Sequence, residues 1–424
     1  MKSFKFDSMK PWKIMLVALI LNNTLTFAQS QIKIYNASVK AYENKEYKTF
    51  LEFTKRLDSI RPFHPTYTYN LASAYALNGK SNEAIATLKK LVLMNNTSAF
   101  ETDEDFNSLK EIDDFKAVVS LKVAQNKVIT SSKSVVTLSE KDLHPEGLIY
   151  LSKSKTWLAS SIRKRKIVSF DIKTGQCTDW FKNDKTLAVL ALKADAKENY
   201  LWVSTAAFPE MLNFDKTMTG KSEILKIDIK TKQVIKAFTV NGKHVFGDLI
   251  VAANGVVYVS DSDKPIVYKI DNDAMTEFIS FEKDGFNLQG LALNKQQDKL
   301  FIADYLKGIA VIDLASKTKT WLSFPEVISA KGIDGLIFHD ATLIAIQNGV
   351  KPIRVTELKL KENQISNFKI LDNNRPEFDE PALATLVGNT VYFFANSPWN
   401  AYDKDGNLDE NKIKNPMLFS CKLD

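Results

Sequence analysis

A run of alternating apolar residues that recurs along the chain constrains its fold more than any other sequence feature. The six copies are Ile167–Asp171, Ile224–Asp228, Val267–Asp271, Ile309–Asp313, Ile353–Glu357 and Met417–Lys422. Upstream of each copy, an earlier apolar run opens at a second landmark. These openings are Glu146, Ala188, Gly247, Gln289, Asp334 and Glu380, at separations of 42, 59, 42, 45 and 46 residues.

A period of about 42 to 46 residues, with short strands separated by turns, is typical of β-propeller blades. The sequence therefore predicts a mainly β fold, a six-bladed β-propeller over residues 124–424. The long second interval contains one insertion, about Ala206 to Lys221. We expect the strand at 134–138 to complete the sixth blade and close the ring, which removes an exposed sheet edge. A β-sandwich would not explain six matched landmarks.

Residues 29–123 have helical spacing instead. Leu71, Ala72 and Tyr75 share one face, Gly79 marks a turn, and Ala84, Leu88 and Leu91 line the next helix. This pattern resembles a tetratricopeptide repeat, and Phe106, Leu109, Ile112 and Phe115 extend the apolar face through a final helix. Because such arrays need about three units to fold alone, we expect this segment to pack against the propeller. A protein partner bound through it is the alternative.

The N-terminus predicts export. Lysines up to Lys13 precede an apolar run from Ile14 to Ile20, and small residues end at Ala28, as in a secretory signal peptide of residues 1–28. The run is too short to span a membrane, so we expect a periplasmic or secreted protein with no membrane span after cleavage. Cys177 and Cys421 could pair there, but two separate cysteines are favoured, since Cys421 occupies a core-facing position.

Composition narrows the classes of function. The chain has 57 basic and 50 acidic side chains, spread along its length with no basic block that alternates with aromatic residues. We therefore expect no nucleic-acid binding. Two cysteines cannot build a four-thiolate metal site. The chain also lacks a Gly-x-Ser-x-Gly nucleophile motif, a His-Glu-x-x-His zinc motif and a phosphate-binding loop.

The landmark positions carry the candidate chemistry. First strands of propeller blades line the central channel, so Glu146, Gln289, Asp334 and Glu380 should converge there. Carboxylates that face one another repel unless protons or a cation intervene, and oxygen ligands suit a hard cation such as calcium. A second polar ring is expected at the channel mouth, from the ends of the second strands: Ser161, Thr205, Asp261, Asp304, Gln347 and Asn396. The alternative is that these acids cap strands and bind backbone amides or water.

At these residues the chain resembles the gluconolactonase, regucalcin and senescence-marker family of six-bladed propellers. The motifs are Pro145-Glu146-Gly147, Gln289-Gly290-Leu291-Ala292 and Ile333-Asp334-Gly335. The resemblance covers about residues 144–424. It implies one divalent cation on the axis, held by a Glu, an Asn and an Asp, and metal-assisted opening of a lactone.

Carried over residue by residue, the family pattern is matched in part. Glu146 and Asp334 match its Glu and Asp, whereas Gln289 replaces its Asn and Gly247 replaces a further channel Asn. The expected metal ligands are Glu146, Gln289 and Asp334, with Glu380 as a fourth candidate. Asp334 is the expected general base, while His144 and His339 are alternatives that more often serve structural roles.

Two functions remain open from sequence. The first is an exported propeller that binds a divalent cation, most simply calcium, and hydrolyses a lactone or ester. The second is a non-catalytic envelope scaffold that binds a protein or glycan through the helices and the propeller. The segment Asp403–Asn407 resembles half a calcium loop but lacks the distal Glu, so a polar hairpin is favoured.

Overall fold

The computed structural model describes residues 31–362 and 364–423, so the expected signal peptide, residues 1–28, lies outside the described residues. The described chain divides into two compact units. One contains residues 31–92 and 97–122, and the other contains 93–96 and the chain from 123 onward. Within the described part, no helix is long and apolar enough to cross a membrane.

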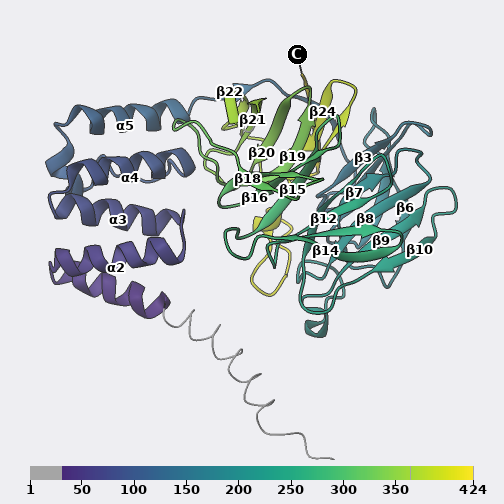
Figure 1. Cartoon of the computed structure of the whole chain (residues 1–424), viewed down its shortest axis with the longest axis horizontal. Coiled ribbons are helices and arrows are strands. Elements are labelled where there is room, and N and C mark those ends of the chain that lie inside the picture. Colours follow the sequence, from purple (N-terminus) through teal and green to yellow (C-terminus); the bar gives the residue numbers. More distant parts are fainter. Residues whose placement is uncertain (1–30, 363, 424) are drawn as a thin grey trace, which may run out of the picture. The chain divides into compact units, whose positions relative to one another are not determined.

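The first unit is helical, as the sequence predicts (Figure 1). Its elements are a helix over residues 31–43, α2 (Tyr47–Ile60), α3 (Pro65–Leu77), α4 (Ser81–Met94), η1 (Glu104–Leu109) and α5 (Asp113–Gln125). The turn between α3 and α4 contains Gly79 at a φ of 70°, a conformation that favours glycine. Ala72, Ala84 and Leu88 are fully buried, which confirms the predicted apolar faces.

The last predicted helix of this unit is divided in two. Phe106 and Leu109 lie in the 3-10 helix η1, and Phe115 lies in α5. The carboxylate of Asp103 accepts a hydrogen bond from the Asp105 backbone N–H, which caps η1 at its start. Phe106, Leu109 and Phe115 are buried as predicted, but they belong to two short elements, η1 and α5, instead of one helix.

The second unit is a six-bladed β-propeller, which confirms the predicted fold class (Figure 1). Blades 1 and 2 are β3 (Leu148–Leu151), β4 (Thr156–Ser161), β5 (Lys166–Phe170), β6 (Cys177–Lys182), and β7 (Ala188–Ala194), β8 (Tyr200–Ala206), β9 (Ser222–Asp228), β10 (Val234–Phe238). Blades 3 and 4 are β11 (Phe246–Val251), β12 (Val257–Asp261), β13 (Ile266–Asp271), β14 (Ala274–Ser280), and β15 (Leu288–Leu293), β16 (Lys299–Asp304), β17 (Gly308–Asp313), β18 (Lys319–Trp321). Blades 5 and 6 contain β19 (Ile333–His339), β20 (Thr342–Gln347), β21 (Arg354–Lys361), β22 (Gln364–Asn373), and β23 (Ala384–Val387), β24 (Thr390–Phe394), β25 (Met417–Lys422).

Segments from before the first blade complete the last two sheets. The strand β2 (Lys133–Thr137) pairs antiparallel with β25, so the outer strand of blade 6 comes from the position where the sequence places the closing strand. The sequence did not reveal that β1 (Ile129–Thr130) extends blade 5 by pairing with β22. Ring closure thus joins the two ends of the propeller sequence and leaves blade 6 with four strands.

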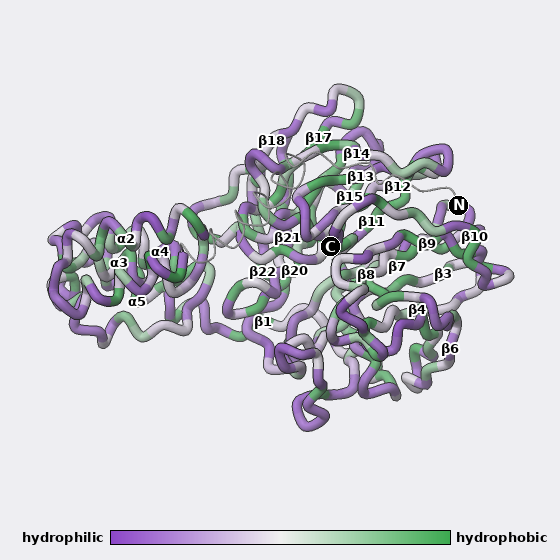
Figure 2. Tube along the Cα trace, turned by 90° about the horizontal axis from the view of Figure 1, so that it is seen from below, coloured by the Kyte–Doolittle hydropathy of each residue, from purple (hydrophilic) through white to green (hydrophobic). Residues whose placement is uncertain are grey.

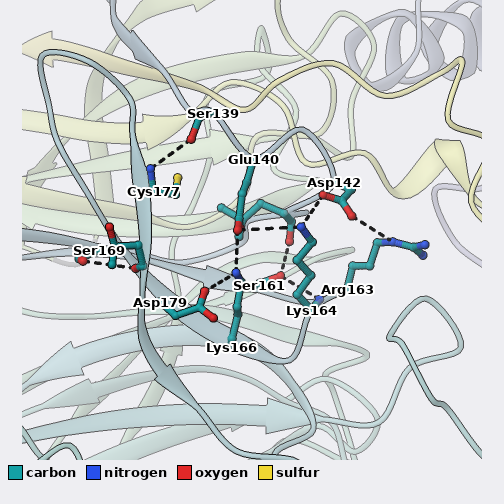
Figure 3. Close-up of polar contacts among 12 residues, drawn as sticks. Ser139, Glu140, Asp142, Ser161, Arg163, Lys164, Lys166, Ser169, Cys177 and Asp179 are labelled. Carbon is teal, nitrogen blue, oxygen red and sulfur yellow. Dashed lines mark hydrogen bonds and ion pairs between the residues drawn. The ribbon is translucent and has the colours of Figure 1, made fainter.

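Polar contacts fix the chain that leaves β2 onto blade 1 (Figure 3). The Lys166 ammonium group pairs with the carboxylates of Glu140, at 2.7 Å, and Asp179. Lys164 pairs with Asp142 at 2.6 Å. Lys166 is 5% exposed, and its ion pairs hold the loop after the closing strand against β5 and β6.

The apolar core lies between neighbouring blades, and the strands of the propeller carry most of the hydrophobic stretches in Figure 2. Across the closure, Val136 and Leu418 of blade 6 pack with Leu148 and Trp157 of blade 1. Cys421 is buried between blades 5 and 6 and forms no disulfide with Cys177, as the sequence favoured. Inter-blade packing therefore supplies the rigid frame of the central channel.

The glycines of the landmark motifs let the first strands approach one another. A Cβ atom on Gly147, Gly290 or Gly335 would lie less than 3.0 Å from a backbone oxygen of the next blade. Those oxygens belong to Leu190, Asp334 and Ala382. The Glu-Gly, Gln-Gly and Asp-Gly dipeptides thus combine a residue that reaches the channel with a residue that permits close packing beside it.

Candidate functional site

A pocket of about 480 Å³ lies where the first strands of the blades open. Its lining residues are Glu146, Leu190, Phe208, Val245, Gly247, Ser262, Asp263, Asn287, Gln289, Tyr305, Asp334, Asn348, Glu380, Leu383 and Trp399. The four candidate metal ligands named from sequence are all present. Of the six landmark positions, Ala188 alone is absent from this lining, because its side chain packs in an apolar cluster with Ile162 and Met211.

Glu146 precedes β3 and is held by residues from blade 6. Its Oε2 accepts hydrogen bonds from the Ser397 hydroxyl at 2.9 Å and from the Trp399 indole N–H at 3.3 Å. Burial, followed by the negative charge of Asp334, raises the pKa of Glu146 to about 8. At neutral pH this carboxyl would therefore hold a proton unless a cation lowers its pKa.

Asp334, at the start of β19, is bonded through one oxygen. Its Oδ2 accepts a hydrogen bond from the Asn348 side-chain amide at 2.6 Å, and Asn348 in turn accepts one from the Tyr305 hydroxyl at 2.9 Å. Burial raises the pKa of Asp334 to about 7, and the charges of Asp248 and Glu380 act in the same direction. This carboxylate is thus poised to exchange a proton near neutral pH.

Glu380 and Gln289 complete the set of oxygen donors. Glu380 precedes β23 and accepts a hydrogen bond from the Asn400 amide at 2.6 Å, while burial raises its pKa. The Gln289 amide N–H donates to Asn287 at 2.5 Å. Its Oε1 lies 3.5 Å from the Ser262 hydroxyl. The amide is therefore oriented with its nitrogen committed to Asn287 and its oxygen toward the pocket wall.

The donor set fits a hard divalent cation in chemistry, although the carboxylates are not assembled around one point. All four ligand candidates offer oxygen, and burial, with neighbouring carboxylates acting in the same direction, raises the pKa values of the three carboxyls. Within residues 31–362 and 364–423, however, no group of three or more His, Cys, Asp or Glu side chains is arranged to hold a metal ion. An ion here would need the Gln289 amide, water or side-chain movement to complete its coordination.

The second polar ring does not form the pocket mouth, so this expectation was wrong. Its six members are at most 3% exposed and are bonded to backbone groups. Asp304 shows why: its two carboxylate oxygens accept hydrogen bonds from the backbone N–H groups of Phe286, Asn287, Leu306 and Lys307. These side chains cap the turns between strands, which is the structural alternative considered for the acids.

The pocket instead uses the residues that follow the ends of the second strands. In blades 3, 4 and 5, Ser262, Tyr305 and Asn348 each come directly after a member of the buried ring. Because neighbouring residues in an extended segment point in opposite directions, one faces the turn and the next faces the pocket. In the sequence, these pocket residues stand one position after the members of the second polar ring, so the same repeat could have identified them.

Apolar residues from two long connections form another part of the lining. Phe208 lies in the segment between β8 and β9, and Trp399 lies in η3 (Trp399–Ala401), between β24 and β25. Their ring centroids are 5.5 Å apart in a T-shaped contact. The sequence predicts the first connection as an insertion, but no local pattern reveals that it meets a segment almost 200 residues later.

Neither alternative base reaches the pocket lining. His144 is fully buried, its Nδ1 lies 3.0 Å from the Tyr402 hydroxyl, and burial lowers its pKa to about 3. His339 stands at the end of β19 opposite to Asp334 and lines a different pocket. The structure therefore gives both histidines positions away from the candidate site.

The segment Asp403–Asn407 forms a tight polar turn. Asp403 Oδ1 accepts the backbone N–H groups of Asp405 and Asn407, each at 2.9 Å, and Tyr402 pairs with Leu408 in an antiparallel bridge. This geometry satisfies the acidic side chain locally, as expected for the polar hairpin favoured from sequence.

No family model and no curated protein sequence matches this chain. Solved structures with a similar fold include an aldose sugar dehydrogenase with bound PQQ from Streptomyces coelicolor, at 15% identity and a TM-score of 0.48 over 70% of this chain and 98% of that one. A virginiamycin B lyase from Staphylococcus aureus matches at 12% identity and a TM-score of 0.44, over 69% of this chain and 99% of that one. A protein described as a candidate gluconolactonase matches at 13% and 0.43, over 69% of this chain and 92% of that one. Identities this low bear on the fold alone.

Proposed function

We propose that this chain is an exported, gluconolactonase-like propeller that binds a divalent cation, calcium first, in its central pocket and hydrolyses a lactone or ester. The observation that carries the proposal is the convergence of Glu146, Asp334, Glu380 and Gln289 on one pocket. Burial raises the pKa values of Glu146 and Asp334, neighbouring carboxylates act in the same direction, and a bound cation would lower both values.

Glu146, Gln289 and Asp334, with Glu380 as a fourth candidate, would hold the ion. A cation bound there supplies electrostatic stabilisation of the negative charge that develops on a carbonyl oxygen. Ser397 and Trp399 orient Glu146, and Asn348 orients Asp334 through a hydrogen bond to one oxygen. The other oxygen of Asp334 is the group that we assign to proton removal from an attacking water.

Hydrolysis of a panel of lactones and aryl esters, with and without calcium, tests this function. We expect metal-dependent turnover by the mature protein and a loss of about 100-fold or more in Asp334→Asn, because the amide cannot accept the proton. Asp340→Asn, at the opposite end of β19, is the matched control and should keep full activity. Background rates with every substrate and metal would contradict the proposal.

The second candidate is a non-catalytic scaffold at the cell envelope, whose tetratricopeptide-like helices and propeller bind a protein or glycan. The observation in its favour is that the described carboxylates are not assembled as a metal site. It would be supported by ligand binding in the pocket with no turnover, and contradicted by hydrolysis that Asp334→Asn abolishes.

A further inference from the structure

The pocket lining combines polar and apolar residues. Most of them carry hydroxyl, amide or carboxyl groups, whereas five are apolar: Leu190, Phe208, Val245, Leu383 and Trp399. Apolar surface that remains open to a pocket gains free energy when a ligand covers it. The metal proposal uses the polar residues and, apart from the Trp399 indole N–H that orients Glu146, gives the apolar residues no role.

Phe208 and Trp399 belong to two connections between strands that contact each other. Besides the contact between Phe208 and Trp399, a Cβ atom on Gly406 would lie less than 3.0 Å from the carbonyl oxygen of Pro209. Gly406 has a φ of 83°, so this close approach coincides with a backbone conformation that favours glycine. The connection after β8 and the connection after β24 therefore touch at two points.

The Trp399 ring is held in a defined orientation. Its indole N–H donates to Glu146, and its ring makes T-shaped contacts with His144, at 4.6 Å between centroids, and with Phe208. A tryptophan fixed by three partners can offer an apolar surface at little further cost in side-chain entropy. This preorganisation distinguishes it from an aromatic residue that is merely exposed.

Charge gives the second constraint on the ligand. The described residues that line the pocket include four acidic side chains, Glu146, Asp263, Asp334 and Glu380, and no Lys, Arg or His. Without a bound metal ion, an anionic ligand would meet these acidic groups and no lining cation of the protein to pair with. The hydroxyl and amide groups of Ser262, Tyr305 and Asn287 instead suit an uncharged polar ligand.

We propose that the Phe208–Trp399 wall is an apolar subsite, and that the pocket selects uncharged ring compounds that carry an apolar substituent next to a hydrogen-bonding edge. This inference deepens the proposed function and rests on it for the location of the reaction. It assigns specificity to two connections between strands, which the repeat itself does not encode.

Three pyranosides that differ in their apolar substituent or in their charge test the subsite by binding alone. The probes are phenyl β-D-glucopyranoside, methyl β-D-glucopyranoside and phenyl β-D-glucuronide, titrated by calorimetry up to about 10 mM, the weak end of measurable affinity, with calcium and with EDTA. We expect the phenyl glucoside to bind at least about tenfold more tightly than the methyl glucoside, because only the former covers the apolar wall. In EDTA, where no metal ion can pair with its carboxylate, the glucuronide should bind roughly 100-fold more weakly than the phenyl glucoside.

Variants then assign the preference to residues. Trp399→Ala should abolish the difference between phenyl and methyl glucosides, whereas Trp399→Phe should retain it, because it keeps an apolar ring without the indole N–H. Phe286→Ala removes an aromatic residue that is 44% exposed and does not line the pocket, so it should leave binding unchanged. Thermal unfolding of each variant verifies that it is folded.

The outcomes separate this inference from the proposed function. Equal affinity for the two glucosides, no binding of the phenyl glucoside, or tight binding of the glucuronide in EDTA would overturn the inference even if lactones are hydrolysed. Conversely, a preference that depends on Trp399, without hydrolysis of any lactone or ester, would support the subsite and contradict the enzymatic proposal.

Discussion

Two rings of polar residues lie at the same end of the propeller and differ in their partners. The outer ring is the buried set Ser161, Thr205, Asp261, Asp304, Gln347 and Asn396, and the inner ring is the set of candidate ligands Glu146, Gln289, Asp334 and Glu380. In the outer ring, Asp304 gives both carboxylate oxygens to four backbone N–H groups. In the inner ring, Asp334 accepts one side-chain amide at Oδ2 and has a pKa raised to about 7. Both aspartates lie near strand ends, but Asp304 is fully buried whereas Asp334 is only partly buried. Asp304 is structural because both of its oxygens accept backbone N–H groups, whereas Asp334 lines the pocket and keeps one oxygen available for chemistry.

The largest expected effect compares the same substitution in the two rings. Asp304→Asn replaces one acceptor oxygen with an amide that faces backbone donors, and should lower the free energy of unfolding by about 3–5 kcal/mol. Asp334→Asn removes a repelling charge and should leave stability equal or slightly higher in the absence of metal. Urea unfolding of both variants measures this, and equal destabilisation would erase the distinction between the rings.

A smaller effect should come from the glycine beside each inner-ring residue. Gly335→Ala would push a Cβ atom against the backbone of Ala382 and should cost about 1–3 kcal/mol. Gly247→Ala is the matched control, because its new Cβ first meets the Ser262 side chain, which can move. Unfolding midpoints give the comparison. If both substitutions were equally mild, close packing of the first strands would not explain the landmark glycines.

A further expected effect is a pH dependence that belongs to the inner ring. The pKa of Glu146 is about 8 in the folded protein, against an ordinary value of 4.5. Between these values the folded state holds a proton that the unfolded chain has lost, so this group's stabilising contribution falls as pH rises. In EDTA, Glu146→Gln should therefore be more stable than the wild type at pH 8, by a margin that shrinks towards pH 4.5.

Glu357→Gln, on β21 and outside the pocket lining, is the control for that titration. Its stability difference from the wild type should not follow the same pH course. A Glu146→Gln difference that stays constant with pH would mean that the carboxyl is already compensated in the folded protein.

The sequence predicted the propeller because the repeat is a local property of each blade. The matched runs at Ile224 and Val267, for example, both fall in third strands, β9 and β13. The inner ring followed from the same logic, since one position per repeat must face the channel. That these residues face a common channel could therefore be inferred from the repeat, without knowledge of any contact between blades.

The features that the sequence missed depend on contacts between distant segments or on a single-residue alternation. The Phe208–Trp399 wall joins two connections that have no repeat position. The second ring was assigned to the mouth because Asp261 and Asp304 are polar, although buried backbone N–H groups at the turns needed acceptors. The polarity of a side chain alone does not determine whether it bonds to backbone N–H groups or faces the pocket.

The central claim is that the inner ring binds a divalent cation, and calorimetric titration of calcium into the mature protein tests it most directly. We expect saturable binding by the wild type with a Kd on the order of 10⁻⁴–10⁻³ M, as in extracellular sites of modest rigidity. The double variant Glu146→Gln, Asp334→Asn should lose it, while Glu357→Gln, Asp340→Asn, which removes the same charge outside the pocket lining, should keep it. Equal calcium affinity in the wild type and the inner-ring double variant would contradict the account.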